Sequence, residues 1–152
     1  MKCGVYIISV VLLANCVIIN HSSEGKWDKL TSTLLKTYKK CQSEFGLKDS
    51  LLRDMYYFSE EKYDLIHRDT GCALVCISRK LELLDENGDV NQENAQEFAI
   101  SHGAEEEVAT DLVADASDCV TQHKGVKDEC LRALETAKCF RTKTKTSTGH
   151  PR

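Results

Sequence analysis

The sequence predicts an all-α fold, in the form of a single domain of about six short helices. Apolar residues recur at intervals of three and four along most of the 152-residue chain, and no segment keeps the alternation of a β-strand. The one proline, Pro151, is too near the end to break a helix in the interior. With 41% hydrophobic and 29% charged residues, the chain is too apolar for a disordered protein, and its length suits one domain.

Residues 1–22 are predicted to form a secretory signal peptide. Lys2 is followed by an apolar run from Val5 to Ile19 and then by polar residues up to Ser23. This run is short for a transmembrane span, which needs about 20 apolar residues, although an uncleaved anchor is an alternative. Cleavage near Ser22 removes two of the eight cysteines and leaves six, an even number that suits disulfide pairing in a secreted chain.

The first helix of the mature chain is predicted over residues 27–45, where Gly46 stops it. A shorter helix follows, with Ser50 as its N-cap residue, because a serine hydroxyl can accept a hydrogen bond from the first turn. The apolar residues that share a face are Trp27, Leu30, Leu34, Tyr38, Cys41 and Phe45 in the first helix, and Leu51, Met55 and Phe58 in the second.

The third helix is predicted to start at Asp69 or Thr70, either of which can act as its N-cap. Cys72, Cys76, Lys80 and Leu84 share one face of it, and Ala73, Ile77 and Leu81 flank that face. Five glycines are interpreted as helix breakers, because they fall at or between the predicted boundaries. These glycines are Gly46, Gly71, Gly88, Gly103 and Gly125.

Three more helices complete the predicted domain. Asn91 caps the fourth helix, which Gly103 closes. The fifth helix follows three acidic residues, 105–107, whose charge favours a helix N-terminus. The sixth helix runs from about Asp128 to Phe140. The apolar stripe of the fifth helix consists of Val108, Leu112, Val113, Ala116, Cys119 and Val120.

Residues 141–152 are predicted to form a flexible basic tail. This segment carries four positive charges, no acidic residue and no apolar side chain other than Pro151, so it cannot bury enough surface to become ordered. The predicted organisation is therefore a signal peptide over residues 1–22, a helical domain over residues 23–140 and the tail.

The six remaining cysteines are spaced Cys41-x30-Cys72-x3-Cys76-x42-Cys119-x10-Cys130-x8-Cys139. Six cysteines in a secreted chain predict three disulfides, for which fifteen pairings are possible. Cys72 and Cys76 lie one turn apart on the same helix, so their side chains project in parallel and are poorly placed to bond to each other. A zinc site is a weaker alternative, because the histidines show no paired spacing with the cysteines.

The chain lacks the sequence motifs of common enzyme classes. No GxSxG, HExxH, GxGxxG or Walker-type sequence is present. The acidic segment Asp85–Asp89 resembles a calcium-binding loop, but its glycine is fourth instead of sixth, so a turn between helices is the better interpretation. His67 lies near two aspartates and has no identifiable nucleophile beside it. We therefore predict no enzymatic activity, no metal and no cofactor.

Several short segments add to the pattern of the cysteines. They are Arg68-Asp69-Thr70-Gly71-Cys72-Ala73, Ser78-Arg79-Lys80-Leu81, Asn94-Ala95 with Glu97-Phe98-Ala99, and His102-Gly103-Ala104. Together with the five cysteine spacings, these segments resemble the insect odorant-binding proteins, and in particular the pheromone-binding and general odorant-binding branch of moths. The resemblance covers roughly residues 23–140.

This resemblance implies both a disulfide pattern and a ligand-binding cavity. It implies a central apolar cavity, in which Phe58 and Phe98 sandwich an extended hydrocarbon chain and Ser78 presents its hydroxyl to the polar end of the ligand. A neutral hydroxyl suits an alcohol, an aldehyde or an acetate better than a charged group. The implied disulfides, which interlock around the cavity, are Cys41–Cys76, Cys72–Cys130 and Cys119–Cys139. The implied cavity walls consist of Leu30, Leu34, Phe58, Leu74, Leu84, Val90, Phe98, Val113 and Phe140.

Three features depart from the pattern of the family. Ser59 follows Phe58 where the family has a tryptophan, so one aromatic wall is missing. Asn91, Gln92 and Ser117 stand where relatives have histidines, to which their acid-triggered ligand release is attributed. The basic tail has no apolar face that could enter a cavity without burying charge. We therefore do not expect the pH switch of the family in this chain.

The resemblance implies a secreted carrier that binds and solubilises small hydrophobic odorants or pheromones. It would transport them through aqueous lymph to a membrane odorant receptor, as a monomer or a weak homodimer. The net charge of −4 argues against a nucleic-acid partner, and no second apolar run predicts stable membrane insertion. Two alternatives are a general lipid or small-molecule carrier in haemolymph or reproductive fluid and a disulfide-stabilised helical effector that acts through its surface.

Overall fold

The computed structural model describes residues 24–147, and the side chains of residues 29–145. The predicted signal peptide lies outside these residues. Within them the chain forms six α-helices and one short 3-10 helix, with no strand, so the predicted all-α fold is confirmed. The elements are α2 (Glu24–Phe45), α3 (Leu51–Ser59), η1 (Tyr63–Leu65), α4 (Arg68–Lys80), α5 (Gln92–Ser101), α6 (Glu106–His123) and α7 (Glu129–Ser147). None of these helices is long and apolar enough to cross a membrane.

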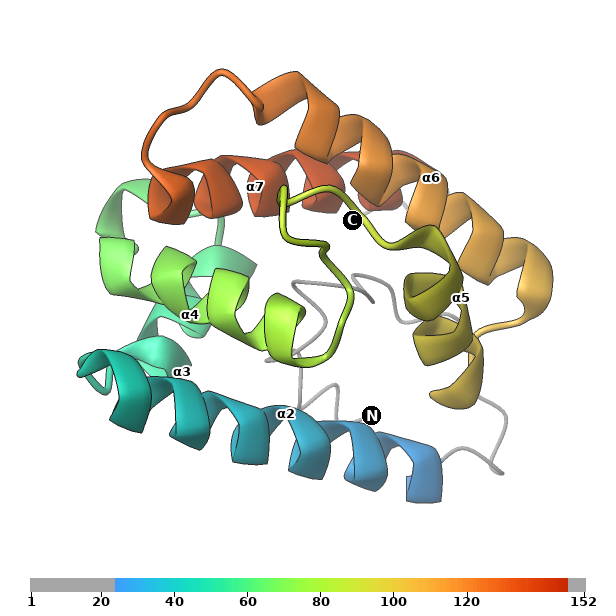
Figure 1. Cartoon of the computed structure of the whole chain (residues 1–152), viewed down its shortest axis with the longest axis horizontal. Coiled ribbons are helices and arrows are strands. Elements are labelled where there is room, and N and C mark those ends of the chain that lie inside the picture. The colour runs from blue at the N-terminus through green and yellow to red at the C-terminus, as the bar shows by residue number, and fades with distance from the viewer. Residues whose placement is uncertain (1–23, 148–152) are drawn as a thin grey trace.

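Helix α4 occupies the middle of the fold. It packs against α2 on one side and against α7 on the other, while α6 lies along α7 and contacts α5 (Figure 1). The largest buried cluster joins residues of α2, α3, α4 and α7, among them Leu34, Phe58, Leu74 and Ala137. Two smaller clusters lie where α5 meets α6 and where α6 meets α7.

Three disulfides link the helices in the pairing that the family resemblance implied. Cys41–Cys76 joins α2 to α4, Cys72–Cys130 joins α4 to α7, and Cys119–Cys139 joins α6 to α7. The two cysteines of α4 therefore tether this helix to two different neighbours. Cross-links of this kind typically contribute about 2–4 kcal/mol each, chiefly because they restrict the unfolded chain.

The apolar stripe predicted for the first helix is buried along most of α2. Leu30, Leu34, Tyr38 and Cys41 are each at most 7% exposed. Phe45 belongs to the same stripe but is 64% exposed, because it lies at the last position of α2 and faces a surface groove beside α4. Burial therefore follows the sequence periodicity only as far as α4 covers the helix.

The N-terminus of α4 is capped from a distant part of the chain. The prediction that Asp69 or Thr70 starts this helix is wrong, because α4 begins at Arg68 and its N-cap residue is His67. The buried carboxylate of Asp54, on α3, accepts hydrogen bonds from the backbone N–H of His67 at 2.8 Å and from the hydroxyl of Thr70 at 2.6 Å. Thr70 is thus held by another helix instead of capping its own.

The two other predicted caps have opposite outcomes. Ser50 stands at the N-cap position of α3, but its side chain makes no capping hydrogen bond and its hydroxyl is buried without a partner in the described structure. Asn91 caps α5 as predicted, because its side-chain oxygen accepts from the backbone N–H of Asn94 at 3.3 Å.

Helix α7 continues to Ser147, seven residues beyond the predicted end of the domain at Phe140. The expected flexible tail is therefore helical as far as residue 147. Two positive charges of this helical segment find partners on other elements, since Lys143 pairs with Asp118 on α6 and Arg141 donates to the carbonyl oxygen of Ser59 at 3.0 Å. These partners lie 25 and 82 positions away in the sequence, which is why composition alone did not predict the order.

The ion pairs of α7 and α4 predict a loss of stability in acid. The hydrogen bond and charge of Lys143 hold the pKa of the Asp118 carboxyl below its usual value, and Arg68 does the same for Asp128. A carboxyl whose pKa is lowered by folding stabilises the protein at neutral pH and loses that contribution as the pH falls through the folded pKa, below about 4. We expect Asp118→Asn and Asp128→Asn to be less stable than wild type at pH 6, and we expect this difference to be smaller at pH 3.

Urea unfolding at the two pH values measures this difference. Asp111→Asn, an exposed position on α6, is the matched control and should follow wild type throughout. If Asp118→Asn or Asp128→Asn differed from wild type in stability by the same amount at both pH values, the ion pairs would not be the source of the acid sensitivity.

Candidate functional site

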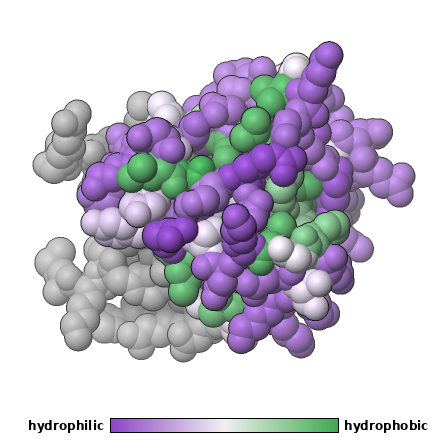
Figure 2. All heavy atoms as spheres, turned by 90° about the vertical axis from the view of Figure 1, so that its left-hand side faces the viewer, coloured by the Kyte–Doolittle hydropathy of each residue, from purple (hydrophilic) through white to green (hydrophobic). Residues whose placement is uncertain are grey.

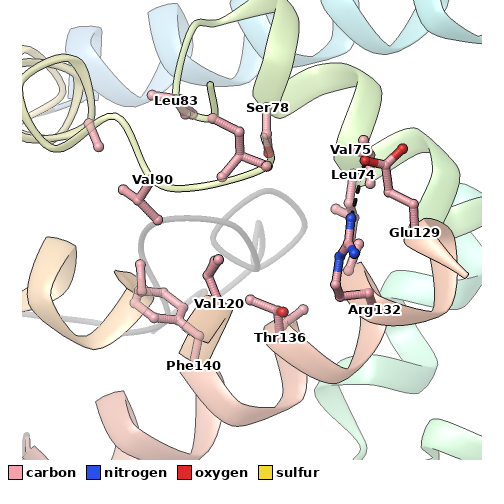
Figure 3. Close-up of a pocket in the computed structure, with 16 residues that line it drawn as sticks. Leu74, Val75, Ser78, Leu83, Val90, Val120, Glu129, Arg132, Thr136 and Phe140 are labelled. Atoms are coloured by element: carbon pink, nitrogen blue, oxygen red, sulfur yellow. Dashed lines mark hydrogen bonds and ion pairs between the residues drawn. The ribbon is translucent and has the colours of Figure 1, made fainter. Parts of the chain in front are cut away.

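A mostly apolar pocket of about 100 Å³ lies between α4, α6, α7 and the loop that connects α4 to α5 (Figure 3). Helix α7 supplies one side of the pocket through residues that lie on a single face of the helix. These residues are Glu129, Arg132, Ala133, Thr136, Ala137 and Phe140. The other sides are formed by Leu74, Val75 and Ser78 of α4, Leu83, Leu84, Gly88 and Val90 of the loop, Ala95 of α5, and Ala116 and Val120 of α6.

The loop between α4 and α5 is held in place by hydrogen bonds, so it forms a defined wall. The carboxylate of Asp85 accepts from the backbone N–H groups of Asn87 at 2.8 Å and Asp89 at 2.9 Å. Gly88 has a φ of +79°, a conformation that favours glycine, and an isolated bridge joins Leu84 to Val90. The acidic segment is therefore a turn that folds the apolar residues on either side of it toward the pocket.

Helices α4 and α7 come together near their first turns and separate along their length (Figure 1). Residues of both helices line the pocket, which therefore lies between them. At the contact, a Cβ atom on Gly71 would overlap the carbonyl oxygen of Cys130 and lie 2.8 Å from its carbonyl carbon. Gly71 lies inside α4 and not at a boundary, so its interpretation as a helix breaker is wrong. Its physical role is to let the two backbones approach.

The charged groups at the pocket neutralise one another. Glu129 and Arg132 both line it, and the two side chains approach to 3.4 Å (Figure 3). The carboxylate of Glu129 also accepts from the guanidinium of Arg79 at 2.5 Å and 3.1 Å. A ligand would therefore meet an ion-paired edge and largely apolar walls.

Five of the ten residues predicted to contact a ligand line this pocket: Leu74, Ser78, Leu84, Val90 and Phe140. The other five lie in the adjoining core. Leu30, Leu34 and Phe58 belong to the cluster that also contains Leu74 and Ala137 of the pocket, Val113 packs with Leu83 and Ala95, and Phe98 packs against both of these clusters.

The two phenylalanines expected to sandwich a ligand have other aromatic or cationic neighbours. The ring of Phe58 meets the ring of Tyr63 edge-on, with centroids 5.3 Å apart, and the guanidinium of Arg141 lies 5.5 Å from its centre. The ring of Phe98 lies 4.2 Å from that of His102. Their proposed role as ligand contacts thus remains a prediction.

Sequence reasoning did not identify the polar residues of α7 as part of the pocket. Glu129, Arg132 and Thr136 lie at intervals of three and four with Phe140, which was predicted, so the helical spacing held the necessary signal. These residues were not predicted because they are polar, and the walls of the cavity were expected to be apolar.

A second depression of about 470 Å³ lies on the surface along α4, between the end of α2 and the start of α7. Its charged residues are paired, with Glu44 to Lys80 at 2.8 Å and Arg79 to Glu129 at 2.5 Å. This end of the molecule is mostly hydrophilic, with small separate apolar areas (Figure 2). The groove is therefore less suited to an apolar ligand than the pocket between α4 and α7.

Comparison with known proteins identifies relatives of the same fold. Residues 26–143 match the PBP/GOBP family. The chain is 38% identical to Pheromone-binding protein 2 of Epiphyas postvittana over 66% of its own length and 61% of that protein. It is 29% identical to General odorant-binding protein 2 of Antheraea pernyi, over 76% of this chain and 72% of that one. The crystal structure of Epiphyas postvittana Pheromone Binding Protein 3 superposes with a TM-score of 0.69 at 44% identity, covering 74% of this chain and 96% of that chain.

Proposed function

Because the chain belongs to the PBP/GOBP family, we propose that it is a secreted carrier of small hydrophobic odorants or pheromones. The carrier binds its ligand, transports it through aqueous lymph and delivers it to a membrane receptor. The relatives are named for binding pheromones and odorants, and the three interhelical disulfides suit a protein that works outside the cell.

The observation that carries this proposal is the apolar pocket between α4 and α7. Its walls are aliphatic or aromatic except for two hydroxyl-bearing residues and one ion pair, which is the composition of a site for a largely apolar molecule. Transfer of the ligand out of water would drive binding, at about 25 cal/mol per Å² of apolar surface buried. No covalent step is needed.

The proposed contacts extend from the pocket into the core beside it. Leu74, Leu84, Val90 and Phe140 form the apolar wall, and Ser78 faces the polar end of the ligand. The remaining proposed contacts are Leu30, Leu34, Phe58, Phe98 and Val113. Three of them pack in the same cluster as Leu74, so a ligand longer than the pocket would reach them by displacing core side chains.

Filling the pocket should abolish most ligand binding. Ala116 lines the pocket from α6, and a phenylalanine there would occupy the space of the ligand. We expect Ala116→Phe to weaken binding at least about tenfold, which corresponds to ~1.4 kcal/mol. The measurement is displacement of a fluorescent hydrophobic probe by long-chain alcohols, aldehydes and acetates.

Ala114→Phe provides the matched control for this experiment. Ala114 is exposed on the same helix and does not line the pocket, so the control should bind like wild type. If wild type bound no member of the panel, the proposed function would be wrong. If both variants bound like wild type, ligands would have to occupy another part of the molecule.

A further inference from the structure

Two hydroxyl groups face the pocket from different helices. Ser78 extends into it from α4, and Thr136 extends into it from α7 on the facing wall (Figure 3). Building on the proposed function, we infer that Thr136 is a second hydrogen-bonding group for the polar end of the ligand. The two hydroxyls together would select a neutral head group whose oxygen accepts two hydrogen bonds, in preference to a carboxylate.

The hydroxyl of Thr136 differs from those of four other threonines in α6 and α7. Thr110, Thr121, Thr142 and Thr144 each donate to the carbonyl oxygen four residues earlier in their helix, at 2.9–3.0 Å. Thr136 makes no such bond and has no other side-chain partner among the described residues, and the same holds for the hydroxyl of Ser78. Both groups are thus available to a molecule in the pocket.

The fold places these two hydroxyls at similar distances from the contact between α4 and α7. Helices α4 and α7 make their closest contact at Gly71 and Cys130, where a disulfide also joins them. Both helices leave this contact in the same direction (Figure 1). Ser78 is seven residues and Thr136 six residues further along, which is about 10 Å and 9 Å of helix. A polar head group lying between the two helices at this distance from the contact would face both hydroxyls.

The charges of the pocket favour a neutral ligand. Glu129 and Arg132 are the charged residues that line it among those described, and each already has a partner. A carboxylate in the pocket would find no unpaired cation and would lie near the carboxylate of Glu129. A carbonyl or alcohol oxygen carries no charge and has two lone pairs, so it can accept from Ser78 and Thr136 together.

The test compares ligands that share an alkyl chain and differ in the head group. Thr136→Val keeps the shape of the side chain and removes the hydroxyl. We expect it to weaken binding of dodecyl acetate by about threefold to tenfold, the range of one neutral hydrogen bond, and to leave dodecane unchanged. Ser78→Ala should show the same selectivity. Wild type should bind dodecyl acetate more tightly than dodecanoate at neutral pH.

Thr121→Val is the control, because Thr121 is an exposed threonine on α6 whose hydroxyl bonds to its own helix. It should bind all three ligands like wild type. An equal loss of dodecyl acetate and dodecane in Thr136→Val, or no loss of either, would overturn the inference and leave the carrier function standing. Tighter binding of dodecanoate than of dodecyl acetate would overturn the preference for a neutral head group. Failure of wild type to bind any of them would overturn the proposed function and this inference with it.

Discussion

Replacing Asp54 with alanine should destabilise the protein by about 3–5 kcal/mol, because it removes two hydrogen bonds to a buried carboxylate, each of which typically contributes about 1.5–3 kcal/mol. The Asp54 carboxylate is completely buried and binds three groups at the start of α4. It accepts from the backbone N–H of His67 at 2.8 Å, the hydroxyl of Thr70 at 2.6 Å and the ring of His67 at 2.9 Å. Without it, the start of α4 would keep a buried hydroxyl and a partly buried backbone N–H that have no acceptor.

Urea unfolding at neutral pH measures this loss. Asp64→Ala, an exposed aspartate in η1, is the matched control and should change stability by less than about 0.5 kcal/mol. His67→Ala separates the contribution of the imidazole from that of the two other donors. A loss below about 1 kcal/mol in Asp54→Ala would contradict the view that this carboxylate anchors α4.

The second large effect is expected at the contact of α4 with α7. Gly71→Ala would place a Cβ atom against the carbonyl group of Cys130, and the disulfide between Cys72 and Cys130 prevents the two backbones from simply moving apart. We expect a destabilisation of about 3 kcal/mol, at the upper end for overpacking, because the obstacle is a backbone and not a flexible side chain. The changed distance between α4 and α7 should also reduce ligand affinity, since the pocket lies between these helices.

Gly125→Ala is the control for this experiment. Its added Cβ would meet no atom within 4 Å, so its stability should stay within about 1 kcal/mol of wild type. Thermal unfolding and probe displacement on the same samples give both readouts. If Gly71→Ala were as stable as Gly125→Ala, this contact could not be what sets the distance between α4 and α7.

Several parts of the structure could be predicted from the sequence because they depend on near neighbours in the chain. The spacing of apolar residues identified the helices that became α2 to α7, and the side chain of Asn91 caps α5 as expected. Cys72 and Cys76 lie one turn apart, which already indicated that they would bond to two other helices. The resemblance to a family added the three disulfide pairings, and half of the ligand contacts that it implied line the pocket.

The remaining features depended on contacts between distant segments. Asp54 looks like a surface residue until α4 is placed over it, and Gly71 looks like a helix breaker until Cys130 approaches it. The basic segment of α7 looks disordered until the acidic side chain of Asp118 pairs with it. In each case the residue type is compatible with two structures, and the partner that decides between them is far away in the sequence.

The same limit applies to the candidate site. An apolar stripe shows which face of a helix turns inward, so the sequence by itself determined that Leu34 and Phe140 would be buried. It could not show that Thr136 lies opposite Ser78 in a pocket, because a stripe looks the same whether the neighbouring helix fills the space or leaves it open. Only the tertiary structure decides this, since the gap exists where α4 and α7 diverge from their contact at Gly71 and Cys130.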